Sequence, residues 1–121
     1  MNKSRPILHY ENFGNGPIDI LLVHGWASSS RMWDNITTHM DNVRFWAVDL
    51  PGFGETPFRN DMRSLDDYVG ALIHFCEVYN LHPQAIIAHS MGGLITLKML
   101  HVRPDLAQQL VLISPVVTGR F

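Results

Sequence analysis

The stretch Ile86-Ile87-Ala88-His89-Ser90-Met91-Gly92-Gly93 decides the fold of this chain. A short apolar run leads directly into a serine flanked by small residues, and the apolar segment 94–102 follows at once. This order is typical of a sharp strand-to-helix turn that exposes a nucleophilic serine at its tip. Small residues are expected two positions either side of the serine because larger side chains would collide there, and glycine also tolerates unusual backbone angles. The usual pattern is G-x-S-x-G, and Ala88 replaces the first glycine while keeping the volume small.

Composition places the chain among globular proteins. Its length of 121 residues suffices for one small domain with a core. Its content of 46% hydrophobic and 17% charged residues is typical of a globular protein. The net charge of −2 creates no strong field for nucleic acid or an anionic membrane. We find no signal peptide and no run near the roughly 18 apolar residues of a membrane span. We therefore expect a cytoplasmic protein without a nucleic-acid partner. The single cysteine, Cys76, excludes an internal disulfide and is interpreted as a buried thiol.

Turn signals separate alternating strand-like and helix-like segments. Apolar runs predict strands over 7–13, 18–23, 43–48, 85–88 and 110–113. Helical spacing predicts a helix capped by Ser29 or Ser30 with Trp33, Ile36 and Met40 on one face, a second after the capping box at 64–67, and a third over 94–102. The second helix is expected to present Leu65, Val69, Leu72, Ile73, Cys76 and Tyr79 on its apolar face.

The alternation of elements predicts an α/β fold with a mostly parallel sheet and helices on both faces. From Ile18 onward strands and helices alternate, and the strands are apolar throughout rather than every second residue. The C-terminal ends of parallel strands then lie on one rim of the sheet, where binding sites form. Four polar residues stand at such strand ends: His24, Asp49, Ser90 and Ser114.

A serine hydroxyl is a weak nucleophile at neutral pH and needs help from its surroundings. A base must take its proton, usually a histidine held by a carboxylate, and donors must stabilise the oxyanion. The backbone N–H of Met91 is one expected donor, since it opens the following helix, where the dipole favours negative charge. The second donor is expected after an earlier strand, and we assign it to the N–H of Trp26 in His24-Gly25-Trp26. Gly25 lets the backbone turn back toward the serine.

Three motifs together resemble the serine-nucleophile branch of the α/β-hydrolase family. They are His24-Gly25-Trp26, Asp49-Leu50-Pro51-Gly52-Phe53-Gly54 and Ala88-His89-Ser90-Met91-Gly92-Gly93, in the family's order. The first two look most like carboxylesterases that cleave pimeloyl-acyl carrier protein methyl ester, and are also similar to esterases, lipases and carbon–carbon bond hydrolases. The resemblance implies hydrolysis of a small-molecule ester through an acyl-enzyme, with no cofactor. It implies Ser90 as nucleophile, Trp26 and Met91 as oxyanion donors, and support from His24, Gly25, Ala88 and Gly92.

The chain departs from the family pattern after Ser90. The family places an acid and then a histidine after the serine, whereas only His101 and Asp105 follow here. His101 lies 11 residues on, roughly 16 Å along a helix at 1.5 Å per residue, so it cannot reach Ser90. We therefore interpret residues 1–121 as the N-terminal portion of a single domain, without the lid, last strands, triad acid and histidine. The strand 110–113 would then be an open apolar edge available for self-association.

Other functions and other residue roles remain open alternatives. The same fold could host an acyltransferase or a carbon–carbon bond hydrolase, or serve as a non-catalytic binding or assembly protein. The histidines show no metal-ligand spacing, and we expect no metal site. No phosphate-loop pattern is present either. We favour structural interpretations for several further residues: loop shaping for His24, rim packing for His89, a loop-fixing acceptor for Asp49, turns for Gly52 and Gly54, and core or pocket wall for Trp26 and Trp33.

Overall fold

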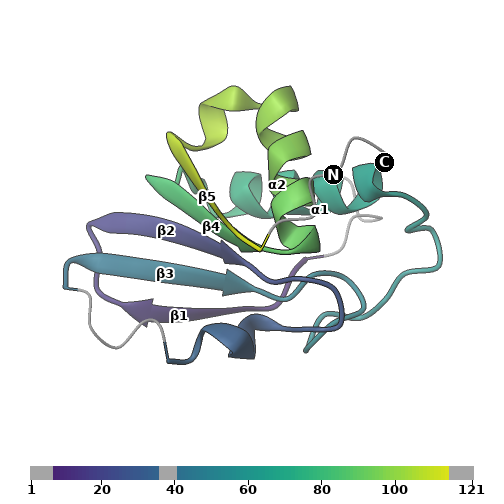
Figure 1. The fold of residues 1–121 in the computed structure, drawn as a ribbon, viewed down its shortest axis with the longest axis horizontal. Helices are drawn as coiled ribbons and strands as arrows, with labels where there is room; N and C mark the ends of the chain where they lie inside the picture. Colours follow the sequence, from purple (N-terminus) through teal and green to yellow (C-terminus); the bar gives the residue numbers. More distant parts are fainter. Residues whose placement is uncertain (1–6, 36–40, 115–121) are drawn as a thin grey trace.

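The computed structural model of this chain describes residues 7–35 and 41–114. Within these ranges, strands form one sheet in the order β1-β3-β2-β4-β5 (Figure 1). β1 runs antiparallel to β3, and the other neighbouring pairs are parallel, which confirms the mostly parallel sheet. The elements are β1 (Tyr10–Gly14), β2 (Ile18–Val23), the 3-10 turn η1 (Ser30–Trp33), β3 (Val43–Val48), α1 (Leu65–Val78), β4 (Ala85–His89), α2 (Met91–Val102), the 3-10 turn η2 (Pro104–Leu106) and β5 (Gln109–Ile113).

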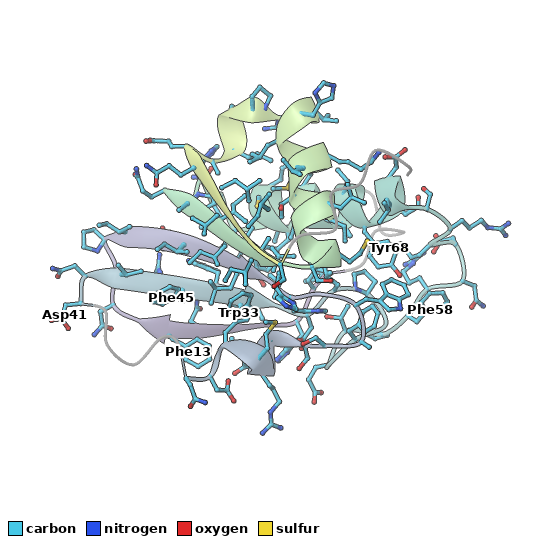
Figure 2. The ribbon with its side chains drawn as sticks, viewed as in Figure 1. Phe13, Trp33, Asp41, Phe45, Phe58 and Tyr68 are labelled. Atoms are coloured by element: carbon cyan, nitrogen blue, oxygen red, sulfur yellow. The ribbon has the colours of Figure 1, made fainter. Side chains whose placement is uncertain are left out.

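The sheet separates two hydrophobic cores, because successive strand side chains point to opposite faces. Leu21 and Val23 of β2 face α1 and α2, which lie together on one side (Figure 1). Ile20 and Leu22 face the other side, which η1 covers in the described part of the chain. Figure 2 shows Phe13, Trp33 and Phe45 gathered on that second side. Burial on both faces explains why the central strands are apolar throughout.

α1 begins where the sequence predicts. The carboxylate of Asp67 accepts hydrogen bonds from the backbone N–H groups of Arg63 (2.6 Å) and Ser64 (3.0 Å), which would otherwise be unpaired at the helix start. Asn80, with a positive φ of 48°, follows the end of the helix. The buried face of α1 differs from the predicted one, because the helix packs against both the sheet and α2. The predicted Leu65, Ile73 and Tyr79 are only partly buried. It consists of Tyr68, Val69, Ala71, Leu72, Phe75 and Cys76.

Three predicted boundaries differ from the structure by more than one residue. β1 begins at Tyr10 instead of residue 7, because His9 pairs its backbone with the loop after β3: its N–H donates to Thr56 Oγ1, and its carbonyl accepts from Asp49 N–H. The helix expected from Ser29 or Ser30 is only the short turn η1 in the described residues, and Ile36 and Met40 fall outside them. α2 begins at Met91 instead of residue 94 because it follows the Ser90 turn directly.

β5 forms one edge of the sheet in the described part of the chain. It pairs with β4 on one side, and two of its apolar side chains are solvent-exposed, Val111 by 47% and Ile113 by 37%. An exposed apolar strand at a sheet edge is a site for pairing with other chains. No helix among the described residues is long and apolar enough to cross a membrane.

Candidate active site

Ser90 occupies a strained turn between β4 and α2. Its φ is 56° and its ψ is −122°, and a positive φ on a residue other than glycine costs on the order of 1–3 kcal/mol. Two hydrogen bonds hold this conformation: Ser90 N–H donates to the Ile113 carbonyl (3.0 Å), and the Ser90 carbonyl accepts from Gly93 N–H (2.9 Å). The end of β5 and the first turn of α2 therefore hold the turn that the sequence predicts.

Small residues around Ser90 let the end of β2 approach closely. A Cβ on Gly92 would lie 2.4 Å from the carbonyl oxygen of His24 and 2.8 Å from that of Val23. A Cβ on Gly25 would lie 2.8 Å from the Cβ of Ser90. Ala88 is fully buried and pairs in register with Val23. Small residues are thus required because the backbone at the end of β2 lies against the Ser90 turn. This contact brings the motifs around His24 and Ser90 into one site.

His24 is buried and uses both ring nitrogens. Nδ1 lies 2.6 Å from the carbonyl oxygen of Gly25, and Nε2 is 2.9 Å from the backbone nitrogen of Leu50. Because the Leu50 N–H can only donate, Nε2 accepts, and the proton sits on Nδ1. Burial lowers the pKa of His24, opposed by the bond to Gly25 and the charge of Asp49. The ring is therefore neutral and committed to the loop, with no free nitrogen for the Ser90 hydroxyl.

Asp49 is a buried acceptor for two loop segments. Oδ1 accepts from the N–H of Ser30 (2.7 Å), and Oδ2 accepts from the N–H of Glu55 (3.0 Å). Its own carbonyl accepts from the hydroxyl of Thr56 (2.7 Å). A Cβ on Gly54 would lie 2.3 Å from the carboxylate carbon, so only glycine fits beside it. This is the geometry of a loop-fixing residue, as the sequence analysis interprets it.

Trp26 and Met91 line one apolar pocket of about 520 Å³. The ring of Trp26 is 61% exposed and packs edge-to-face against Phe53, with centroids 5.0 Å apart. Phe58 and Tyr68 lie beyond the C-terminal ends of β2 and β3 (Figure 2). The sequence did not predict the part of the pocket that the loop after β3 forms. The available signal was Phe58 and Met62, two apolar residues in an otherwise polar loop. The remaining lining residues are Phe58, Met62, Arg63, Ser64, Leu65, Tyr68 and Leu94.

In the described part of the chain, no histidine ring is hydrogen-bonded to the Ser90 hydroxyl. His101 is exposed in the last turn of α2, and Asp105 is ion-paired with Arg103 (3.0 Å). Nδ1 of His89 is buried without a partner among the described residues and faces Gly25, 3.0 Å from the position of a Cβ there. Across residues 7–35 and 41–114, no group of three or more side chains could hold a metal ion.

Comparison with known proteins places this geometry in a family. Residues 18–120 match the family described as serine aminopeptidase, S33. The chain is 31% identical over 111 residues to the lipase LipV of Mycobacterium tuberculosis, covering 91% of this chain and 42% of the lipase. It is 36% identical over 112 residues to a pimeloyl-[acyl-carrier protein] methyl ester esterase of Shewanella sp., covering 91% and 39%. The structure of a marine microorganism esterase superposes with a TM-score of 0.82 at 25% identity, over 88% of this chain and 41% of that one.

The superposition on the esterase structure agrees with the overall fold of this chain. The chain spans about two fifths of the length of each of these three proteins. The family match nevertheless covers all the strands from β2 onward and both helices. The chain therefore belongs to the serine aminopeptidase S33 family of α/β-hydrolases.

Proposed function

We propose that this chain carries the nucleophile half of a carboxylic ester hydrolase that works through an acyl-enzyme on Ser90. The observation that carries the proposal is the contact of Gly25 with Ser90. The loop after β2 packs against the serine side chain, where a second oxyanion donor is required. The ester class is supported by relatives whose names identify a lipase and a methyl ester esterase.

The proposed reaction has two steps. Ser90 Oγ attacks the acyl carbon of the ester, its proton passes to a base, and the N–H groups of Trp26 and Met91 donate to the oxyanion. The alcohol leaves with the proton from the base, and water then cleaves the acyl-enzyme by the same route. This proposal places the base and its acid outside residues 1–121; His24 is engaged in the loop, and His101 lies in the last turn of α2.

The pocket beside Trp26 and Met91 supports the proposal that an apolar part of the ester binds there. Its walls are predominantly aromatic and aliphatic side chains from the loop after β3 and the first turns of α1 and α2. Such a surface favours hydrocarbon by removing apolar area from water. Arg63 and Ser64 are the polar members of this lining that can meet a solvated part of the same ligand.

A chimera tests the proposal. Residues 1–121 would be joined to the part of the Shewanella esterase that the match does not cover. We expect the folded chimera to hydrolyse p-nitrophenyl butyrate, and the Ser90→Ala chimera, matched in circular dichroism, to lose that hydrolysis. The 121-residue chain alone should not be labelled by a fluorophosphonate.

Two results would overturn parts of the proposal. A folded chimera that keeps its activity in Ser90→Ala refutes the nucleophile. Stoichiometric labelling of the 121-residue chain, lost in Ser90→Ala, shows that the base lies within this sequence.

A further inference from the structure

Two loops beside Ser90 exchange hydrogen bonds in a reciprocal pattern. Nε2 of His24, in the loop after β2, accepts from the N–H of Leu50 in the loop after β3 (2.9 Å). Oδ1 of Asp49, in the second loop, accepts from the N–H of Ser30 at the end of the first (2.7 Å). Each loop thus contributes one side-chain acceptor to the backbone of the other. Trp26 lies between the two points of attachment on the first loop.

Both acceptors lie where water cannot replace them. His24 is 0% and Asp49 is 1% exposed, so losing either acceptor leaves a buried N–H without a partner, which is unfavourable. Among residues 7–35 and 41–114, these two bonds are the direct hydrogen bonds between the two loops. These two hydrogen bonds therefore fix the first loop relative to the second at two points.

The clamped loop also meets the nucleophile and the pocket. Gly25 contacts Ser90, as its hypothetical Cβ lies 2.8 Å from the serine Cβ. Phe53 of the second loop packs edge-to-face on both His24 (5.6 Å) and Trp26 (5.0 Å). A shift of either attachment point would consequently move the backbone N–H of Trp26 relative to Ser90. Such donors must be held in place before the reaction to be effective.

We infer that His24 and Asp49 form a two-point clamp that positions the N–H of Trp26 toward an oxyanion on Ser90. The inference rests on the proposed function for the roles of Trp26 and Ser90. His24 and Asp49 are positioning residues here: they act through the loop and transfer no proton. Both hydrogen bonds constrain the same loop, so the loss of one weakens the other. The effects of substituting His24 and Asp49 on oxyanion binding are therefore not additive.

Hydrogen exchange tests the clamp without any need for activity. The full 121-residue chain would be measured at micromolar concentration by mass spectrometry with residue-level fragmentation. In His24→Leu we expect exchange at Ser30 N–H to accelerate at least tenfold, although His24 makes no bond to Ser30. His24→Gln, whose side-chain oxygen can stand near the position of Nε2, should restore slow exchange. The Asp49→Asn side chain has one acceptor oxygen and can pair with only one of the two backbone N–H groups, Ser30 or Glu55, that the carboxylate binds. In this variant, exchange at Leu50 N–H should accelerate.

The matched control is Asp19→Asn, at the far end of β2. Asp19 accepts from Arg44 Nε and Trp46 Nε1, both at 2.9 Å, and touches neither loop. This variant loses a structural carboxylate of the same type but should leave exchange at Ser30 and Leu50 unchanged. Unchanged exchange at Ser30 in folded His24→Leu, or equal acceleration in Asp19→Asn, refutes the clamp whatever the fate of the proposed function.

A boronic acid then tests what the clamp positions. In the esterase chimera with butylboronic acid, Ser90 Oγ forms a bond to the trigonal boron, its proton passes to the base, and the tetrahedral boronate places an oxygen where the oxyanion would be. We expect His24→Leu and Asp49→Asn each to weaken this binding about 10- to 100-fold, in keeping with the loss of one oxyanion donor. Binding of 1-pentanol, which uses only the apolar pocket, should weaken less than boronate binding does. The double variant should bind boronate no more weakly than the weaker single variant.

The outcomes separate the two proposals. If the esterase chimera binds boronate no better than its Ser90→Ala variant, the nucleophile assignment fails while the exchange data still decide the clamp. If clamp variants bind boronate as wild type does, or lose boronate and pentanol binding equally, His24 and Asp49 do not position an oxyanion donor. Additive losses in the double variant would show two independent structural sites.

Discussion

Replacing Gly92 by alanine should damage the Ser90 turn through one added methyl group. The new Cβ would lie 2.4 Å from the His24 carbonyl oxygen, which is 0.6 Å inside the 3.0 Å limit below which such contacts are essentially never found. The two closest neighbours are backbone atoms at the end of β2, which cannot turn aside as a flexible side chain could. Overpacking of this kind costs typically 1–3 kcal/mol, and we expect the upper part of that range.

Helix propensity acts in the opposite direction and sets the net value. Gly92 is the second residue of α2, and alanine is better than glycine in a helix interior by about 1 kcal/mol, with less of that gained at a helix end. The expected net loss for Gly92→Ala is therefore about 1–2 kcal/mol in the free energy of unfolding. Gly70→Ala in α1 is the matched control, because nothing lies within 4 Å of its added Cβ. It should gain about 0.5–1 kcal/mol.

Urea unfolding followed by circular dichroism measures both variants. The informative quantity is the difference between their free energies of unfolding, about 1.5–3 kcal/mol, because helix propensity contributes to both variants and the clash to only one. If Gly92→Ala were as stable as Gly70→Ala, the close approach of β2 to the Ser90 turn would be wrong. In the esterase chimera, Gly92→Ala should also lower kcat, since the turn that carries Ser90 must shift.

Three further predictions follow from burial and exposure. Burial lowers the pKa of His24 below its ordinary 6.5, so the unfolded chain takes up the proton first; stability should be full above pH 6.5 and fall as the pH drops below it, and His24→Gln should flatten that part of the profile. Burial raises the pKa of Cys76 to about 12, so iodoacetamide at pH 8 should leave the folded chain unmodified and alkylate it in urea; rapid alkylation of the folded chain would contradict this. The isolated chain should self-associate through the exposed face of β5, and Val111→Lys should raise the monomer fraction in light scattering; a wild-type chain that is monomeric at high concentration would count against the open edge.

Much of the architecture follows from local signals in the sequence. The strands β2, β3, β4 and β5 coincide with apolar runs, since a parallel strand covered on both faces excludes polar residues. The start of α1 follows from Asp67, whose carboxylate pairs with N–H groups three and four residues before it. The turn at Ser90 follows from small residues between an apolar run and a helix. Each of these signals lies within a few residues of the element that it predicts.

Other features depend on contacts that no local pattern records. The burial of Tyr68 and Phe75 depends on where α1 packs, and the length of η1 depends on bonds around Ser29 and Asp34. The apolar pocket gathers residues from the loops after β2 and β3 and from both helices. The periodicity of apolar residues indicates which face of an element is buried, but not which neighbouring element covers that face. Those neighbours are chosen by tertiary packing.

The sequence by itself determined the family, the parallel sheet and the strained turn that exposes Ser90. It also marked His24, Gly25 and Asp49 as residues of interest, because glycine and polar side chains stood at the ends of predicted strands. Only the tertiary structure decided that Gly25 lies against Ser90 and that His24 and Asp49 bind each other's loops. Those bonds span 26 and 19 residues of sequence. Their partners are backbone N–H groups, which every residue except proline carries, so no side-chain pattern could reveal them.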